Sequence, residues 1–341
     1  MEIRALQESE FDEHAELVYV SYSHERDLKP GEMLAHRDWW LRSIERDAYY
    51  EPAQTRVMSV DGRLVASVGC YYRPTWVRGQ RVEAACIGSV CTHPDHRRKG
   101  YVREILSEAT QWMRAQGWEW SFLYGLEAVY GGSGWQNLAA FDLVAELTPR
   151  ADLPTRTECG QSFTERLADP DDDADVRLLA RLYDEFCAPL TGATVRTKEY
   201  WRRRVLSSTP WGPGREYWIL EAADGAFLGY YCMSGAAVRE IAWCGRPHEV
   251  LAMVLARAGG QPVSFPFAHP ELVQALRELA AIPTQAQCRE RAGAITLREA
   301  YKGLWRHHGI DDPVLWRLRD TDDLVRMLHD SDYVMWPADR A

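Results

Sequence analysis

The sequence predicts an α/β protein in which the second half repeats the order of strands and helices of the first. Two observations support this prediction. The apolar run at 84–90 is too short for an ordinary helix and ends in valine, which indicates a buried strand, and a basic loop connects it to a helix at 101–116. In each half an Asp-Gly pair separates two apolar runs, which is the strongest short signal for a β-hairpin.

The elements of the first half follow from the spacing of its apolar residues. The helix at 101–116 ends at Gly117 and carries an apolar face of Val102, Ile105, Leu106, Ala109 and Met113. The other expected elements are, in order, a strand at 2–6, helices at 8–22 and 32–45, hairpin strands at 55–60 and 64–72, a central strand at 82–91, an aromatic strand at 118–124, a short helix at 126–130 and a strand at 139–147.

The loop before the helix at 101–116 has the composition of a phosphate-binding turn. It runs Arg97-Arg98-Lys99-Gly100, directly after the central strand. A glycine that opens a helix lets a ligand approach the backbone closely, and the free N–H groups at the positive end of the helix dipole favour an anion. The arrangement therefore predicts that a phosphorylated ligand binds at this turn.

The same residues resemble motif A of the GNAT superfamily of acetyl-CoA-dependent N-acetyltransferases. Pro94, Arg97, Gly100 and Leu106 fall on the motif, and Val102 replaces its second small residue, as in the Eis-like acetyltransferases. An ordinary basic helix N-terminus would explain Arg-x-x-Gly alone, but the strand, proline, loop and helix together favour acetyl-CoA. The resemblance implies a coenzyme site formed by Val90, Cys91, Thr92, Arg97, Arg98, Lys99, Gly100, Tyr101, Val102, Arg103, Gly125 and Leu126.

The resemblance also implies a general acid. Tyr130 lies where Eis-like enzymes keep the tyrosine that protonates the leaving thiolate, a role that a phenol can fill when it is well placed. The alternative is that Tyr130 only packs in the core. Glu83 and Glu127 are candidates for the base that deprotonates the amine, and both could equally be surface carboxylates.

The second half resembles a degenerate GNAT-like domain. Its expected elements are helices at 176–186, 197–206, 249–258 and 269–279, and strands at 217–222, 227–233, 238–242, 263–267 and 294–298. The loop at 244–248 lacks Arg-x-x-Gly, so we expect no second acetyl-CoA there. The resemblance implies two tandem domains, 1–150 and 151–341, each a mixed central sheet flanked by helices, with helical stretches at 315–328.

That tandem arrangement is similar to the first two domains of Eis-like proteins and to fungal lysine acetyltransferases. The roughly forty residues after Arg298 are too few for the sterol-carrier-like domain of the Eis-like proteins. The base that this domain supplies through its terminal carboxylate therefore cannot be assumed here, and whether the carboxylate of Ala341 takes its place is left open.

Composition narrows the function. A net charge of −10 argues against a nucleic-acid partner. We expect no metal: the acidic run at 169–175 fits a solvated helix cap, and His307-His308 fits a solvated helix end. Cysteines such as Cys70, Cys86 and Cys232 lie in apolar strands and are expected to be free thiols of a cytoplasmic protein. No apolar run is long enough to span a membrane, so no membrane partner is expected.

The sequence thus predicts an acetyl-CoA-dependent N-acetyltransferase that acts on the primary amine of a small molecule by direct transfer. Acidic and aromatic residues over the first two helices favour a cationic acceptor, namely Glu25, Asp27, Glu32, Asp38, Trp39 and Trp40. Two alternatives stay open: a non-catalytic acyl-CoA-binding sensor or scaffold, and a protein lysine or N-terminal acetyltransferase.

Overall fold

The structure is a computed structural model of the 341-residue chain. It describes residues 1–23, 31–124, 127–130, 133, 135–147, 163–207, 215–259, 261–265, 270–281 and 295–309.

The first half alternates strands and helices as the sequence predicts. Its elements are β1 (Glu2–Ala5), η1 (Glu8–Glu10), α1 (Phe11–Ser23), α2 (Glu32–Arg46), η2 (Pro52–Gln54), β2 (Thr55–Val60), β3 (Arg63–Tyr72), β4 (Thr75–Val77), β5 (Gln80–Val82), β6 (Ala84–Thr92), η3 (Pro94–His96), α3 (Tyr101–Ala115), β7 (Trp120–Tyr124), α4 (Glu127–Tyr130) and β8 (Gln136–Leu147). Asp61 and Gly62, both at positive φ, form the turn between β2 and β3, as expected for Asp-Gly in a hairpin.

The second half repeats this order of strands and helices. Its elements are β9 (Phe163–Leu167), α5 (Asp173–Cys187), β10 (Thr191–Thr194), α6 (Lys198–Tyr200), η4 (Trp201–Leu206), β11 (Tyr217–Ala222), β12 (Phe227–Ser234), β13 (Ala237–Trp243), α7 (Pro247–Arg257), β14 (Val263–Phe265), α8 (Pro270–Ala281) and β15 (Ile295–Gly309). The predicted repetition of a mixed sheet flanked by helices is therefore confirmed.

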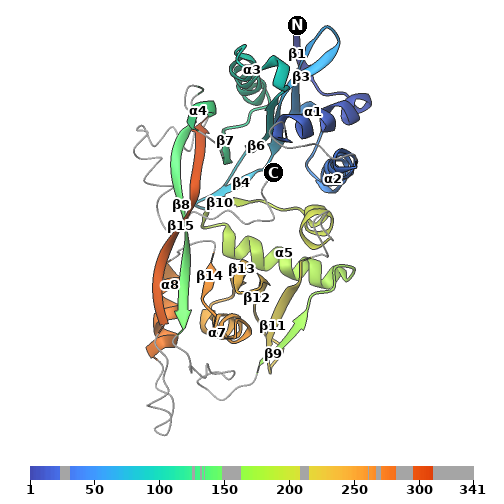
Figure 1. Ribbon diagram of the computed structural model, residues 1–341. Helices are drawn as coiled ribbons and strands as arrows, with labels where there is room; N and C mark the ends of the chain where they lie inside the picture. Colours follow the sequence, from blue (N-terminus) through green and yellow to red (C-terminus); the bar gives the residue numbers. More distant parts are fainter. Residues whose placement is uncertain are drawn as a thin grey trace.

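One 12-stranded sheet runs through both halves, in the order β1-β2-β3-β6-β7-β15-β8-β14-β13-β12-β11-β9. The halves exchange strands at its centre: β15, from the end of the second half, pairs with β7, while β8, from the end of the first half, pairs with β14. β8 and β15 also pair with each other along their lengths and lie side by side (Figure 1). The division of the chain into two domains near residue 150 remains a proposal.

Helices cover both faces of the first half of the sheet (Figure 1). The apolar face predicted for α3 is buried against the sheet through Ile105, Leu106, Ala109 and Met113. On the opposite face α1 and α2 pack against β2, β3 and the end of β6, with Trp40 in this core. In the second half α5, α7 and α8 enclose a separate apolar cluster.

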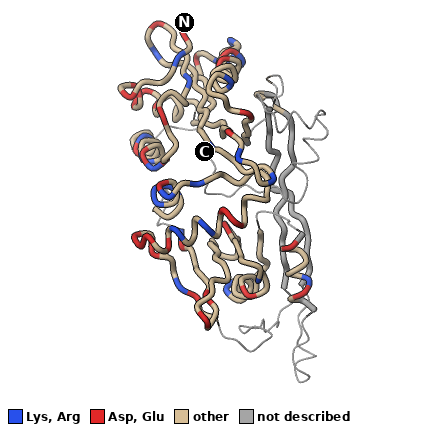
Figure 2. Tube along the Cα trace, turned by 180° about the vertical axis from the view of Figure 1, so that it is seen from behind, with Lys and Arg blue, Asp and Glu red and all other residues tan. Residues whose placement is uncertain are grey.

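Charged residues of both signs lie along the described helices, and acidic residues gather where the chain enters α5 (Figure 2). The expected helix cap is confirmed there, because Asp172 is the N-cap of α5 and its carboxylate accepts the amide of Ala174 at 2.8 Å. Asp175 is instead buried and pairs with Arg166.

The structure differs in two ways from the expectations for the second half and its junction. His307 and His308 lie in β15 and pair with β7 residues, so the expected helix end is wrong; pairing on both sides extends this strand well beyond 294–298. Strands β4, β5 and β10 were not expected, because each has only three or four residues, and β10 pairs with a strand distant in sequence, β4. The helical stretches expected at 315–328 lie outside the described residues.

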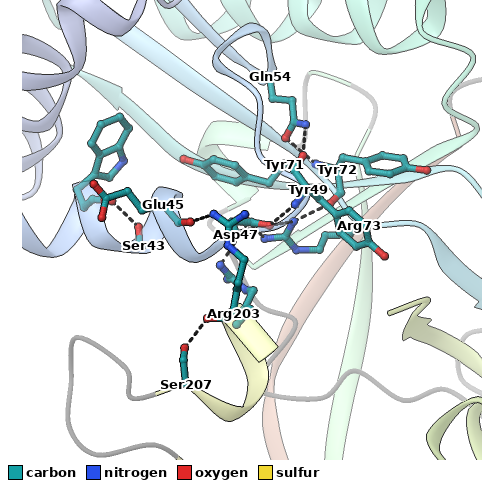
Figure 3. A network of polar contacts seen from close by, with 12 residues as sticks. Ser43, Glu45, Asp47, Tyr49, Gln54, Tyr71, Tyr72, Arg73, Arg203 and Ser207 are labelled. Atoms are coloured by element: carbon teal, nitrogen blue, oxygen red, sulfur yellow. Dashed lines mark hydrogen bonds and ion pairs between the residues drawn. The ribbon is translucent and has the colours of Figure 1, made fainter. Parts of the chain in front are cut away.

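Those three short strands form a second sheet, in the order β10-β4-β5, that joins the halves. An ion pair lies beside it (Figure 3). The carboxylate of Asp47, after α2, binds the guanidinium of Arg73, which follows β3, and it lies 3.3 Å from Arg204 of the second half. Nearby, the Tyr49 hydroxyl donates to the carbonyl of Val195 at 2.8 Å. Side chains of both halves therefore converge on Asp47.

Burial and charge act in opposite directions on Asp47. Burial alone would raise the pKa of this carboxyl, but the charges of Arg73 and Arg204 outweigh it and hold the pKa below its usual value. The Asp47 and Arg73 side chains are only 4% and 1% exposed, so removing one partner would leave the charge of the other buried without it.

We therefore expect Asp47→Asn to lower the free energy of unfolding by about 3–5 kcal/mol, as for other broken buried ion pairs. Urea unfolding measures the change. Arg177→Ala is the matched control, since it removes an exposed pair with Asp173 and should cost at most about 0.5 kcal/mol. Equal unfolding midpoints for both variants would contradict a stabilising role for the Asp47 pair.

Candidate active site

The site begins where two parallel strands separate. β6 and β7 pair in parallel from Ala84 and Trp120 to Cys86 and Phe122. In the described part of the chain no pair joins these strands further along, although β6 continues to Thr92. β7 instead pairs with β15 on its other side, through all its residues up to Tyr124. The last six residues of β6 therefore present backbone groups that β7 does not use.

A β-bulge lies within this open stretch of β6. The register with β3 shifts by one residue between Ser67 and Gly69, and Ser89 has a φ of 47°, which is uncommon for a residue other than glycine. The bulge is held from β3. The Ser67 hydroxyl donates to the Ser89 carbonyl at 2.8 Å, and the Tyr71 hydroxyl lies 2.7 Å from the Ser89 Oγ.

Burial raises the pKa of Tyr71 to about 12, so its hydroxyl stays protonated and keeps this bond. The ring reaches the bulge by crossing Gly69, where an added Cβ would lie only 2.5 Å from the Tyr71 ring. Glycine at 69 is therefore what lets β3 fix the position of the bulge.

A pocket of about 550 Å³ lies along the open stretch of β6 and the turn that follows. Most residues expected to hold the coenzyme line it: Val90, Cys91, Thr92, Arg97, Arg98, Gly100, Tyr101, Val102 and Arg103. Lys99 is exposed in the same turn but does not line the pocket. Gly125 and Leu126 lie outside the described residues.

The turn at one end of the pocket suits a phosphate group. Gly100 is the N-cap of α3 with a φ of 85°, and an added Cβ there would meet nothing within 4 Å. Within the described chain, no acceptor is bonded to the amides of residues 99–102, which lie at the positive end of the α3 dipole. The exposed cations Arg98, Lys99 and Arg103 surround these amides. Backbone and charge thus fit the diphosphate of a coenzyme.

Arg97 has a different part in this turn. Its Nη2 donates to the carbonyl of Ser21 at 2.6 Å and its Nε to that of Thr92 at 3.4 Å. The guanidinium therefore fastens the end of α1 to the end of β6. Arg97 was expected to bind the coenzyme, but its guanidinium is already bonded to these two carbonyls.

Tyr130 lies beside residues that line the pocket. It closes α4, is 8% exposed, and contacts the ring of Trp135 edge-on at 6.2 Å between centroids. Its neighbours Val129 and Ser133 line the pocket, and the amide of Ser133 donates to the Tyr130 carbonyl. The structure therefore brings Tyr130 close to the pocket lining.

The two candidate bases are placed differently. Glu83 precedes β6, at the end of the strand opposite the pocket, where it pairs with Arg81 at 3.1 Å and accepts the Tyr72 hydroxyl. At about 3.3 Å per residue, it lies on the order of 20 Å along the strand from Val90, a position that argues against a catalytic role. Glu127 begins α4, the helix of Tyr130, and its side chain lies outside the described residues.

Five lining residues were not expected from the sequence: Ser21, Tyr22, His96, Val129 and Ser133. Ser21 and Tyr22 lie in the last turn of α1, more than seventy residues before the turn that they adjoin. Their proximity depends on the packing of α1 against β6, which no local pattern encodes. His96 is the one that the sequence could have indicated, since it lies within the turn itself.

The described residues also bear on metals, disulfides and membranes. No group of three or more His, Cys, Asp or Glu side chains there could hold a metal ion. The cysteines at 70, 86, 91, 187, 232 and 244 are free, as expected for the three named from sequence. No helix among the described segments is long and apolar enough to cross a bilayer.

Comparison with known proteins agrees with this geometry. Residues 2–138 match the family model of the acetyltransferase (GNAT) domain. No curated protein sequence matches the chain.

Solved structures share the fold at low sequence identity. A probable N-acyltransferase from Enterococcus faecalis V583 superimposes with a TM-score of 0.63 at 15% identity, over 97% of this chain and 74% of its own. A GCN5-related N-acetyltransferase from Anabaena variabilis superimposes with a TM-score of 0.61 at 12% identity, over 91% of this chain and 73% of its own. Eis1 from Mycobacterium abscessus superimposes with a TM-score of 0.58 at 18% identity, over 91% of this chain and 74% of its own. With the family match at residues 2–138, we conclude that this chain carries an acetyltransferase domain of the GNAT superfamily.

Proposed function

We propose that this GNAT domain transfers an acetyl group from acetyl-CoA to the primary amine of a small cationic molecule. The observation that carries the proposal is the set of residues that line the pocket. They comprise the turn with free amides and cations at the start of α3, the open edge of β6, the end of α1 and residues beside Tyr130. A ligand with a phosphorylated part and a reactive part matches this lining.

In this proposal different residues bind different parts of the coenzyme. The amides after Arg98 and the side chains of Arg98 and Arg103 would hold the diphosphate, which charge-assisted hydrogen bonds favour. The backbone of Val90 and Thr92 would bind the amide-containing arm, as an added strand binds an open sheet edge.

The surroundings of Cys91 favour direct transfer over a cysteine-bound intermediate. Burial raises the pKa of this thiol, so little thiolate is present to attack a thioester. In direct transfer the amine nitrogen attacks the thioester carbonyl, the carbon–sulfur bond breaks, and the thiolate takes a proton from the Tyr130 hydroxyl. The proton that the acylated nitrogen loses passes through solvent and restores the Tyr130 hydroxyl. The amine must first lose its proton, for which Glu127 or a water chain is proposed and Glu83 is not.

The acceptor is proposed from charge. Glu32, at the start of α2, accepts the Tyr19 hydroxyl at 3.3 Å, and Asp38 lies on the same helix. Trp40 belongs to the core under α1 and does not contribute a pocket wall. A cationic amine suits the acidic side chains of Glu32 and Asp38 and the net charge of −10.

The proposal predicts that the native chain releases thiol from acetyl-CoA in the presence of some small amines. A panel of amino acids, polyamines, aminoglycosides and lysine peptides, read by thiol release, provides the test. Activity on peptides alone would replace the small-molecule acceptor with a protein. No release with any acceptor, despite coenzyme binding, would favour a sensor or scaffold.

Coenzyme binding depends on the open space at Gly100. We expect Gly100→Ala to weaken acetyl-CoA binding by about tenfold or more, because the new methyl group displaces a charge-assisted hydrogen bond worth ~1.5–3 kcal/mol. Calorimetry measures this affinity. Gly62→Ala is the matched control, since Gly62 also has positive φ and open surroundings but lies in the β2–β3 turn. Equal affinities in both variants would contradict the proposed phosphate site.

Tyr130→Phe tests the general acid. Removing the hydroxyl should slow the chemical step by about 10²–10⁴-fold while acetyl-CoA affinity is retained. Single-turnover kinetics and calorimetry separate these two effects. Tyr183→Phe is the control, because it removes a buried hydroxyl bonded to the Thr194 carbonyl in the second half. If both variants turn over like the native chain, Tyr130 is only a packing residue.

A further inference from the structure

Tyr22 makes an unusual contact at the edge of the pocket. It is the second-last residue of α1, and 61% of its surface is exposed. Its hydroxyl nevertheless reaches β6 and donates to the carbonyl of Val90 at 2.9 Å. This hydrogen bond holds a largely exposed side chain against β6.

The acceptor of this bond belongs to the pocket. Val90 follows the bulge at Ser89 and lies beyond Cys86, where pairing between β6 and β7 ends. Both Tyr22 and Val90 line the pocket. The hydroxyl of Tyr22 therefore satisfies a carbonyl on the open strand edge along which an extended ligand would bind.

We propose that Tyr22 is a displaceable cap on this carbonyl, a positioning residue that gives it up when the amide of the coenzyme arm binds. The inference rests on the proposed coenzyme site. Displacement costs little desolvation, because the released hydroxyl moves into water. The end of α1 stays in place, since Arg97 holds the neighbouring carbonyl of Ser21 at 2.6 Å. Only the Tyr22 side chain has to move.

This cap has an unusual consequence for a residue in a binding pocket. A hydroxyl that must be displaced opposes binding, so its removal should strengthen binding. Tyr22→Phe keeps the ring and removes only the bond to Val90. We expect it to bind coenzyme A about fivefold more tightly, the equivalent of one net hydrogen bond.

Titration calorimetry with two ligands tests this inference. Coenzyme A carries the amide-containing arm, whereas adenosine 3′,5′-bisphosphate carries only the nucleotide end. Tyr22→Phe should strengthen binding of coenzyme A and leave binding of the bisphosphate unchanged. Tyr19→Phe is the matched control: it removes a hydroxyl from the same helix, bonded to Glu32 outside the pocket lining, and should change neither affinity.

Each other outcome is decisive. Unchanged coenzyme A affinity in Tyr22→Phe would show that the carbonyl is not contested, and weaker binding would show that Tyr22 holds the ligand itself. Tighter binding of both ligands would mean a general loosening of the pocket. Any of these overturns the cap alone, whereas a native chain that binds no coenzyme A overturns the coenzyme site as well.

Discussion

The separation of β6 from β7 is the constraint on which the rest of the site depends. Two parallel strands that stayed paired would consume the backbone groups of β6 and leave no edge for a ligand. Here the pairing ends at Cys86, while on its other side β7 pairs along its whole length with β15, a strand supplied by the second half. The second half therefore contributes to the site through the sheet, although it adds no described residue to the pocket.

The repeat of the fold in the second half lacks the features of a phosphate site. At the start of α7, in the position of α3, the carboxylate of Glu249 accepts Arg246 at 2.8 Å. Pro247 also begins α7 and has no amide to donate, and Arg246 takes the N-cap place that glycine fills in α3. The retained strand order, the exchanged strands and the ion pair of Asp47 all indicate a supporting role for this half.

The features that could be predicted from sequence are those whose conformation is determined by residues close together in the chain. The apolar face of α3, the Asp-Gly hairpins and the turn at Arg97 to Gly100 each depend on spacing within about fifteen residues, and each is present. The position of β15 between β7 and β8 depends on partners more than 150 residues away, and so the histidines at 307 and 308 were misjudged. Glu83 was suggested by its residue type, whereas its position relative to the pocket depends on the length of β6.

The same contrast between local and long-range determinants explains why the proposed coenzyme-binding part of the site could be predicted from sequence and the proposed acceptor-binding part could not. Backbone amides bind a diphosphate, and backbone geometry follows from short motifs with glycine in fixed places. The reactive end is bounded by side chains from α1, β6 and α4, brought together by packing alone. Tyr22 shows how such a residue acts: its type is unremarkable and its neighbours carry no motif. Its importance comes from the one carbonyl that it reaches across 68 positions of sequence.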